Sequence, residues 1–294
     1  MKAGVIGLGA MGSGMAKNLA EAGMLASVWN RTRKTADEWA QKLGVPAAAE
    51  PAELARQCDV IITCVSADED VLSVLRDMLP GLAEGKVVVD TSTVSVDTVH
   101  KAADLAASKG ARFLDAPVSG GKEGAHNASM VMMVGGSREA FDRALPVLQA
   151  ISKSQTYMGE SGKGQATKAV NQIMVAGINQ AVTEALGFGQ AMGLDMDKVV
   201  DVVGSGAAGN WFVNHRGKTM TKGIFEPGFK LALHHKDLSI CQHMLDQLDV
   251  ALPVVEMTLK HYEKLMAEGH GDEDISALYR AKKRLFEEGN KRSL

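Results

Sequence analysis

The sequence has few of the features that mark several protein classes. Its three cysteines, Cys58, Cys64 and Cys241, are odd in number and show no CxxC spacing. They are most simply interpreted as small buried apolar residues of a protein in a reducing compartment. The eight histidines include the neighbours His234 and His235, but there is no HExxH motif, and adjacent residues of a helix point in different directions. No metal site is therefore predicted.

Long hydrophobic runs and a strong charge bias are also missing. No apolar run is long enough to span a bilayer, and the apolar opening of the chain is broken by glycines, unlike a signal peptide. The formal net charge is −3, from 32 basic and 35 acidic residues, so the chain has no general attraction for nucleic acid or anionic membranes. We expect a cytoplasmic protein with no nucleic-acid or membrane partner. Its 294 residues suffice for two domains.

A glycine-rich motif follows the first predicted strand. Residues 3–8 form a short apolar run, and a helical pattern that ends at Gly23 begins directly after the motif. In a GxGxxG motif the first glycine permits a tight turn, the second lets the backbone approach a pyrophosphate, and the third lets helix and strand pack closely. This context predicts dinucleotide binding rather than a merely flexible turn. The predicted cofactor contacts here are Gly7, Gly9, Ala10, Met11 and Gly12.

The end of the second predicted strand bears on the choice of coenzyme. An NAD-binding protein usually places a carboxylate there for the ribose 2′-hydroxyl, whereas this chain continues with Asn30, Arg31 and Thr32. A guanidinium can stack on adenine or bind a 2′-phosphate, and a threonine hydroxyl can donate to the same group. The alternative is a solvated basic turn that precedes the next helix. The pattern favours NADP(H) over NAD(H).

Strands and helices continue to alternate through about residue 160. Further strands are predicted at 58–65, 86–93, 111–118 and 130–136, which indicates a mostly parallel sheet with ligands at the carboxyl ends of its strands. At these ends lie Val65 and Ser66, the segment 91–93 and the segment Ser119-Gly120-Gly121. Small residues at 119–121 leave backbone N–H groups open to a carboxylate or phosphate, although a turn needed only for its geometry has the same composition.

The pattern changes to helices alone at residue 162, which we take as a domain boundary. Residues 162–192 contain no proline and have apolar residues at helical spacing on most sides, so this helix is expected to be buried. Lys168 lies near its start, and Asn171 and Gln172 follow on the same face. Two interpretations are open for Lys168: a stem that packs while the ammonium reaches water, or a catalytic amine.

The second half of the chain is predicted to be helical throughout. Trp211 and Phe212 follow a glycine-rich loop at 205–210, and either wall a substrate pocket or pack in a core. The basic and acidic tail is expected to be a solvated face. Helices are predicted at 195–203, 211–220, 229–248, 253–268 and 275–288.

Five motifs together resemble those of the β-hydroxyacid dehydrogenases, in order and spacing across essentially the whole chain. They are Ile6–Gly12, Asp90–Thr93, Asp115–Gly121, Gly162–Gln172 and Lys236-Asp237-Leu238. This family includes 3-hydroxyisobutyrate dehydrogenase, tartronate semialdehyde reductase and the glyoxylate/succinic semialdehyde reductases. Two positions depart from the common pattern: Gln172 stands where many relatives have a second asparagine, and Val65-Ser66 stands where Leu-Pro is common.

The resemblance implies an α/β protein with an N-terminal Rossmann domain at 1–161. A long helix joins it to an all-helical substrate and oligomerisation domain at 162–294, in a homodimer or homotetramer. It implies that Lys168 is the catalytic residue and that the substrate contacts are Ser119, Gly120, Gly121, Asn171 and Gln172. Its cofactor contacts, beside those of the glycine-rich loop and Asn30, Arg31 and Thr32, are Val65, Ser66, Thr93 and Lys236.

These inferences predict an NADP(H)-dependent oxidoreductase that interconverts a small β-hydroxy acid and its semialdehyde or oxo acid, with Lys168 as general acid and base. The distance from a carboxylate anchor to the reacting carbon then selects the substrate. Three alternatives are kept: an NAD-dependent 3-hydroxyisobutyrate or serine-type dehydrogenase, a non-catalytic NADP-binding module and an imine reductase. The retained lysine and the Ser-Gly-Gly segment argue against the last two.

Overall fold

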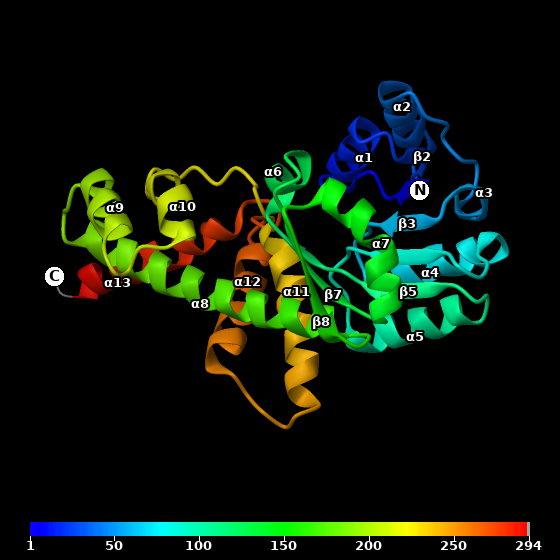
Figure 1. The fold of residues 1–294 in the computed structure, drawn as a ribbon. Helices are drawn as coiled ribbons and strands as arrows, with labels where there is room; N and C mark the ends of the chain where they lie inside the picture. Colours follow the sequence, from blue (N-terminus) through cyan, green and yellow to red (C-terminus); the bar gives the residue numbers. More distant parts are fainter. Residues whose placement is uncertain (293–294) are drawn as a thin grey trace. The chain divides into compact units, whose positions relative to one another are not determined.

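The computed structural model describes residues 1–292 and has the predicted α/β architecture (Figure 1). The chain divides into two compact units, Met1–Lys168 and the residues from Ala169 onward. Alternating strands and helices form the first unit, and helices alone form the second. Among the described helices, none combines the length and hydrophobicity needed to cross a lipid bilayer.

The described strands of the first unit form one eight-stranded sheet in the order β2-β1-β3-β4-β5-β7-β6, with β8 paired to β7. Strands β1 to β5 pair in parallel, as expected for strands joined by crossover helices. Strand β7 runs antiparallel to β5 and β6, and β8 runs parallel to β7. The strands are β1 (Ala3–Ile6), β2 (Leu25–Trp29), β3 (Val60–Thr63), β4 (Val87–Asp90), β5 (Arg112–Asp115), β6 (Val118–Ser119), β7 (Val131–Gly135) and β8 (Ser154–Gly159).

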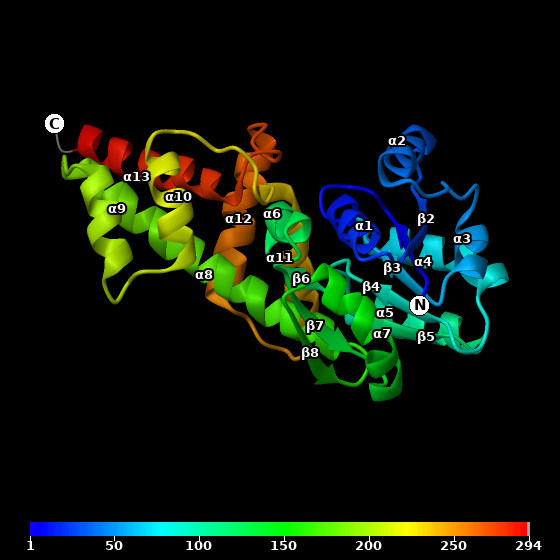
Figure 2. The same ribbon diagram turned by 45° about the horizontal axis from the view of Figure 1, so that its top comes forward.

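Helices cover both faces of this sheet, because its strands are apolar on both sides (Figures 1 and 2). In β4, Val87 and Val89 point to one core and Val88 to the other. The first core is closed by α1 (Gly12–Glu21), α2 (Arg33–Leu43) and α7 (Arg138–Ile151). The second is closed by α3 (Pro51–Gln57), α4 (Asp68–Met78) and α5 (Val96–Ala107). Short elements are η1 (Leu79–Gly81) and α6 (Gly121–His126).

Two features of the first unit differ from the sequence prediction. The strand predicted at 111–118 is interrupted: β5 ends at Asp115 and β6 begins at Val118. Pro117 lies at the break and has no N–H to donate to a sheet ladder. The short helix α3 is an addition to the predicted elements, although Pro51 stands at its start, where proline is favoured.

The second unit packs around the long helix α8 (Lys163–Ala191). Its core contains Phe212, Leu238, Tyr262 and Leu278, one from each of four later helices. These helices agree with the predicted segments to within a few residues. They are α9 (Met196–Ser205), α10 (Trp211–Thr221), α11 (Leu231–Asp246), α12 (Pro253–Ala267) and α13 (Leu278–Arg292), with the short η2 (Ile275–Ala277) before the last.

The prediction that α8 is buried on most sides is wrong for the single chain. Val170 is 58% exposed and Met174 is 62% exposed. Part of the buried face of α8 is instead polar, because Asn179 donates to the hydroxyl of Tyr262 and to the backbone oxygen of Ile275, both over 2.9 Å. Buried amides are tolerated where they are hydrogen-bonded in this way. The apolar residues of α8 thus exceed what the core of one chain covers.

Candidate active site

The glycine-rich loop has the geometry of a phosphate-binding turn. Gly7 has a φ of +93°, and a Cβ there would lie 2.2 Å from the backbone oxygen of Cys64. A Cβ at Gly12 would lie 1.9 Å from the backbone oxygen of Gly7, so this glycine allows α1 to pack against β1. At Gly9, by contrast, a Cβ would have none of the described atoms within 4 Å. Gly9 is therefore not required for packing, which fits its predicted role in admitting a pyrophosphate.

Burial keeps the neighbouring thiol neutral. The Cys64 side chain follows β3 beneath this loop, and desolvation raises the pKa of its thiol to about 11. The thiol is therefore protonated at neutral pH. The same cause raises the pKa of the buried Cys58 to about 12. None of the three cysteines, all of which lie in the described residues, forms a disulfide.

Asn30 connects the tip of β2 to the glycine-rich loop. Its Oδ1 accepts a hydrogen bond from the backbone N–H of Leu8 over 3.0 Å, and its Nδ2 donates to the backbone oxygen of Thr32 over 3.3 Å. Its amide therefore holds the loop and the following turn together. A contact of Asn30 with a coenzyme stays a prediction.

Arg31 is paired with a carboxylate that the sequence did not reveal. Its Nη1 lies 2.7 Å from Oδ1 of Asp70, which stands in the first turn of α4. The arginine side chain is 82% exposed, so this pair is weak in energy but sets the direction of the guanidinium. The turn at 30–32 therefore carries the positive charge of Arg31 and lies next to the negative charge of Asp70.

The ends of β3 and β4 are joined through a buried aspartate. Oδ1 of Asp90 accepts hydrogen bonds from Thr63 Oγ1 over 2.7 Å and from Ser92 Oγ over 2.8 Å. Ser92 Oγ in turn accepts from the backbone N–H of Val65 over 2.9 Å. Burial raises the pKa of Asp90 to about 6, and Oδ2 has no hydrogen-bond partner among the described residues. Asp90 thereby fixes the turn at Val65, a predicted cofactor contact, without being exposed itself.

Lys168 lies in the first unit and is 7% exposed. Its Nζ donates to the backbone oxygen of Val118 over 2.8 Å. The alternative in which the ammonium of Lys168 reaches water is therefore wrong. Val118 directly precedes Ser119, Gly120 and Gly121, and the two glycines have φ angles of +137° and +62°. The structure thus brings the predicted catalytic amine to the start of the predicted carboxylate-binding turn.

Asp115 holds the start of the helix that carries Lys168. Its Oδ1 accepts from the backbone N–H of Gly162 and its Oδ2 from that of Gln165, each over 2.9 Å. These bonds satisfy N–H groups that a helix N-terminus leaves without internal partners. Burial raises the pKa of Asp115, and these hydrogen bonds oppose the rise.

Asp70, Asp90, Asp115 and Gln165 are supporting residues to which the sequence analysis assigned no role, although Asp90, Asp115 and Gln165 lie within its motifs. For Asp90 and Asp115 the sequence held one usable signal, namely a carboxylate as the last residue of a buried strand, since such a group needs a specific partner.

In the second unit, Asn171 and Gln172 form one chain of hydrogen bonds with α11. Asn171 Nδ2 donates to Gln172 Oε1 over 2.7 Å, and Gln172 Nε2 donates to Asp237 Oδ2 over 2.7 Å. The ammonium of Lys236 lies 3.2 Å from Asp237 Oδ1. Gln172 is buried, so its amide is suited to orienting Asn171. Three predicted site residues are thus linked through Asp237.

The two aromatic residues after the glycine-rich loop at 205–210 lie in different surroundings. Phe212 is buried in the helical core, as one of the two interpretations predicted. Trp211 is exposed, and its ring stacks on His215 with centroids 4.3 Å apart. The Trp211 ring therefore does not share the core position of Phe212.

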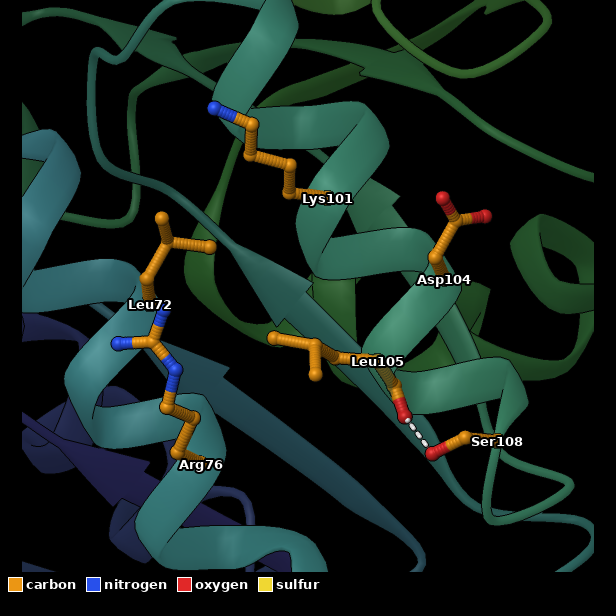
Figure 3. A pocket seen from close by; sticks show the side chains of 6 residues that line it. All are labelled: Leu72, Arg76, Lys101, Asp104, Leu105 and Ser108. Carbon is orange, nitrogen blue, oxygen red and sulfur yellow. Dashed lines mark hydrogen bonds between the residues drawn. The ribbon is translucent and has the colours of Figure 1, made fainter.

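One surface hollow of the first unit contains none of the predicted site residues. It has a volume of about 370 Å³ and lies between α4 and α5 on the outside of the sheet (Figure 3). Its lining residues are Leu72, Arg76, Lys101, Asp104, Leu105 and Ser108. Leu72 and Arg76 extend from α4, and Lys101, Asp104 and Leu105 extend from α5 (Figure 3).

Comparison with known proteins identifies the family. The family model of the NAD binding domain of 6-phosphogluconate dehydrogenase matches residues 2–159. The model described as NAD-binding of NADP-dependent 3-hydroxyisobutyrate dehydrogenase matches residues 162–282. Glyoxylate/succinic semialdehyde reductase 1 of Arabidopsis thaliana is 31% identical over 286 residues, which are 96% of this chain and 99% of that relative.

Solved structures agree with this assignment. Mycobacterium tuberculosis 3-hydroxyisobutyrate dehydrogenase, solved with L-serine, is 30% identical with a TM-score of 0.86, over 95% of this chain and 98% of that one. Psf3, solved with NADP+ and 2-OPP, is 27% identical with a TM-score of 0.86, over 95% and 99% of the two chains. The chain belongs to the β-hydroxyacid dehydrogenase family and is an NAD(P)-dependent dehydrogenase that acts on CH–OH groups.

Proposed function

We propose that this protein is a cytoplasmic enzyme that interconverts a small β-hydroxy acid and its semialdehyde or oxo acid, with NADP(H) as the favoured coenzyme. The observation that carries the proposal is the position of Lys168, a buried amine 2.8 Å from the backbone oxygen that precedes the Ser119-Gly120-Gly121 turn. A bound nicotinamide coenzyme supplies or accepts the hydride. The protein must then supply a proton donor, an anchor and an orientation for the substrate.

Lys168 acts as the general acid and base in this proposal. In the direction of reduction its ammonium gives a proton to the carbonyl oxygen, and in the direction of oxidation the neutral amine takes the hydroxyl proton. Val118 holds Nζ at a fixed place, so the amine need not be ordered when the substrate binds.

The Ser119-Gly120-Gly121 turn serves as the carboxylate anchor. The two glycines have positive φ angles, and in this proposal the backbone N–H groups of the turn donate to the substrate carboxylate. The Ser119 hydroxyl adds a further donor. Because this turn begins one residue after the partner of Lys168, it sets the distance from the carboxylate to the reacting oxygen.

The preference for NADP(H) rests on the turn after β2. It has no carboxylate of its own, and Arg31 is exposed. Thr32, Val65, Ser66, Thr93 and the glycine-rich loop complete the proposed coenzyme contacts of the first unit. One observation favours the alternative, an NAD-dependent 3-hydroxyisobutyrate or serine-type dehydrogenase: Asp70 offsets part of the positive charge of Arg31.

The helical region, which we place at 162–294, contributes substrate orientation and oligomerisation in this proposal. Asn171, held by Gln172 and Asp237, orients the substrate, and Lys236 contacts the coenzyme. Assembly into a homodimer or homotetramer would cover the exposed Val170 and Met174, which lie one turn apart on α8.

Initial rates on a small substrate panel test the proposal. The panel comprises succinic semialdehyde, glyoxylate and tartronate semialdehyde for reduction, and 3-hydroxyisobutyrate, 3-hydroxypropionate and serine for oxidation, each with both coenzymes. Rapid oxidation of NADPH by one aldehyde acid is expected. A clear preference for the NAD form would contradict the coenzyme assignment. Coenzyme binding without turnover of any acid would favour a substrate outside the panel or the non-catalytic module, and turnover of imines alone would favour an imine reductase.

A further inference from the structure

The side chain of Gln165 hydrogen-bonds to the backbone of the two residues that flank Thr93. Its Nε2 donates to the backbone oxygen of Ser92 over 2.7 Å, and its Oε1 accepts from the backbone N–H of Val94 over 3.3 Å. Both partners lie more than 70 residues earlier in the chain, in the loop after β4. Gln165 is only 3% exposed, so its amide depends on these two bonds.

The backbone of Gln165 is fixed at the same time. Its N–H donates to Asp115 Oδ2 over 2.9 Å, at the end of β5. Gln165 lies three residues before Lys168 on α8, and residues at this spacing share one face of a helix. One residue therefore connects the end of β5, the loop at Thr93 and the turn of helix that carries Lys168.

We propose that Gln165 is a positioning residue that sets the place of the Thr93 loop relative to Lys168. This inference rests on the proposed function, in which Thr93 contacts the coenzyme and Lys168 transfers the proton. The side-chain amide of Gln165 hydrogen-bonds to the backbone on both sides of Thr93. Gln165 acts through the loop that it clamps and through the helix to which it belongs.

Loss of the amide has a predictable physical effect. A leucine of similar size leaves the oxygen of Ser92 and the N–H of Val94 buried without their partner, and such groups move toward water or toward other partners. The loop at Thr93 then shifts while Asp115 still holds the helix through its backbone. Displacement by about 1 Å is enough to lower a rate by about 100-fold.

The test compares Gln165→Leu with Gln155→Leu. Gln155 also donates its Nε2 to a backbone oxygen, that of Ser152, over 2.8 Å, but it belongs to β8, and its printed side-chain hydrogen bonds go to Ser152 rather than to the loop at Thr93. For Gln165→Leu we expect kcat to fall by about 10-fold to 100-fold, and the Kd for NADPH, measured by the fluorescence of the bound nucleotide, to rise about 3-fold to 10-fold. Gln155→Leu should change both by less than about twofold.

A second variant, Gln165→Glu, tests the same two contacts with a side chain of the same length. Gln165→Glu keeps an acceptor for Val94 but, when ionised, places a carboxylate oxygen against the backbone oxygen of Ser92, so at neutral pH it should also lower kcat and raise the Kd for NADPH. Melting temperature is measured for each variant. Equal losses in the Gln165 and Gln155 variants, or unchanged kcat and Kd in the folded Gln165→Glu protein, would overturn the inference.

Lys168→Ala separates this inference from the proposed function. It should abolish turnover and leave the Kd for NADPH unchanged, whereas Gln165→Leu should alter both. If Lys168→Ala retains turnover, the proposed function fails. If Lys168→Ala is inactive while both Gln165 variants resemble wild type, the positioning role alone fails.

Discussion

Nη1 of Arg31 lies 2.7 Å from Oδ1 of Asp70, so the cation after β2 is directed by a carboxylate from the first turn of α4. This pair joins two consecutive βα units of the sheet at the place where the coenzyme choice is expected to be made. An arginine held in this direction loses less side-chain freedom when a phosphate binds.

Arg31→Ala should weaken NADPH binding about 10-fold or more and change NADH binding by less than about twofold. The reason is that NADPH carries a 2′-phosphate that loses a charged hydrogen bond to the arginine, whereas NADH has no such phosphate. Titration of both nucleotides measures this. Lys34→Ala is the matched control, since it removes one exposed positive charge just beyond the same turn. Equal weakening of NADPH and NADH by Arg31→Ala would show that the arginine stacks on adenine instead.

Asp90→Asn should change the pH dependence of stability. Burial raises the pKa of Asp90 from 3.8 to about 6, so the folded protein binds this proton more tightly than the unfolded chain. Wild type therefore loses stability as the pH rises from about 4 to about 6, and the asparagine variant lacks this contribution. Relative to wild type, the free energy of unfolding of the variant should rise across this range by up to roughly 3 kcal/mol.

Denaturant unfolding at pH 4, 5, 6 and 7 measures this difference, with Asp104→Asn as the control at an exposed carboxylate. A constant difference between Asp90→Asn and wild type at all four values would contradict the assignment. So would a variant that loses stability relative to wild type as the pH rises.

Two glycines of α8 should respond in opposite directions to alanine. A Cβ at Gly164 would lie 2.4 Å from the backbone oxygen of Met133 and 2.5 Å from that of Asp115, so Gly164→Ala must displace the start of the helix. At Gly177 the nearest atom, in Val254, lies 3.9 Å away. We expect Gly164→Ala to destabilise the protein by about 1–3 kcal/mol. Gly177→Ala should stabilise it by about 0.5–1 kcal/mol.

Calorimetric melting of the two alanine variants decides this prediction, and turnover is measured on the same samples. Gly164→Ala should also lose activity, because the displaced helix carries Lys168. Equal melting temperatures for the two variants would mean that the contact of Gly164 with β5 and β7 is not rigid.

The elements of the fold were largely predictable from local patterns. The glycine-rich motif, the apolar strands and the proline-free segment at 162–192 each carry their signal within a few residues, and the structure confirms their type. Pro117 could have predicted the break between Asp115 and Val118. No residue pattern predicted that β7 runs antiparallel to β5 and β6. Pairing direction depends on the path of the chain, which a periodic pattern does not specify.

The residues that support the predicted site were harder to find. Gln165 and Ser92 are hydrogen-bonded although 73 positions separate them in the sequence, and Arg31 and Asp70 are paired although 39 positions separate them. No sequence motif predicts contacts at such separations. The long apolar stretch of α8 was also misleading. It predicted burial at Val170 and Met174, whereas polar residues such as Asn179 occupy much of the buried face through hydrogen bonds to distant helices.

The most direct test of the proposed mechanism is the activity and NADPH affinity of Lys168→Ala, beside Lys163→Ala as an exposed lysine of the same helix. With an aldehyde acid that the wild type reduces, Lys168→Ala should lose turnover by about 1000-fold or more, in keeping with the loss of a general acid, and should bind NADPH as wild type does. Lys163→Ala should retain both. Turnover within about tenfold of wild type in Lys168→Ala, or loss of NADPH binding alone, would contradict the proposed role of Lys168.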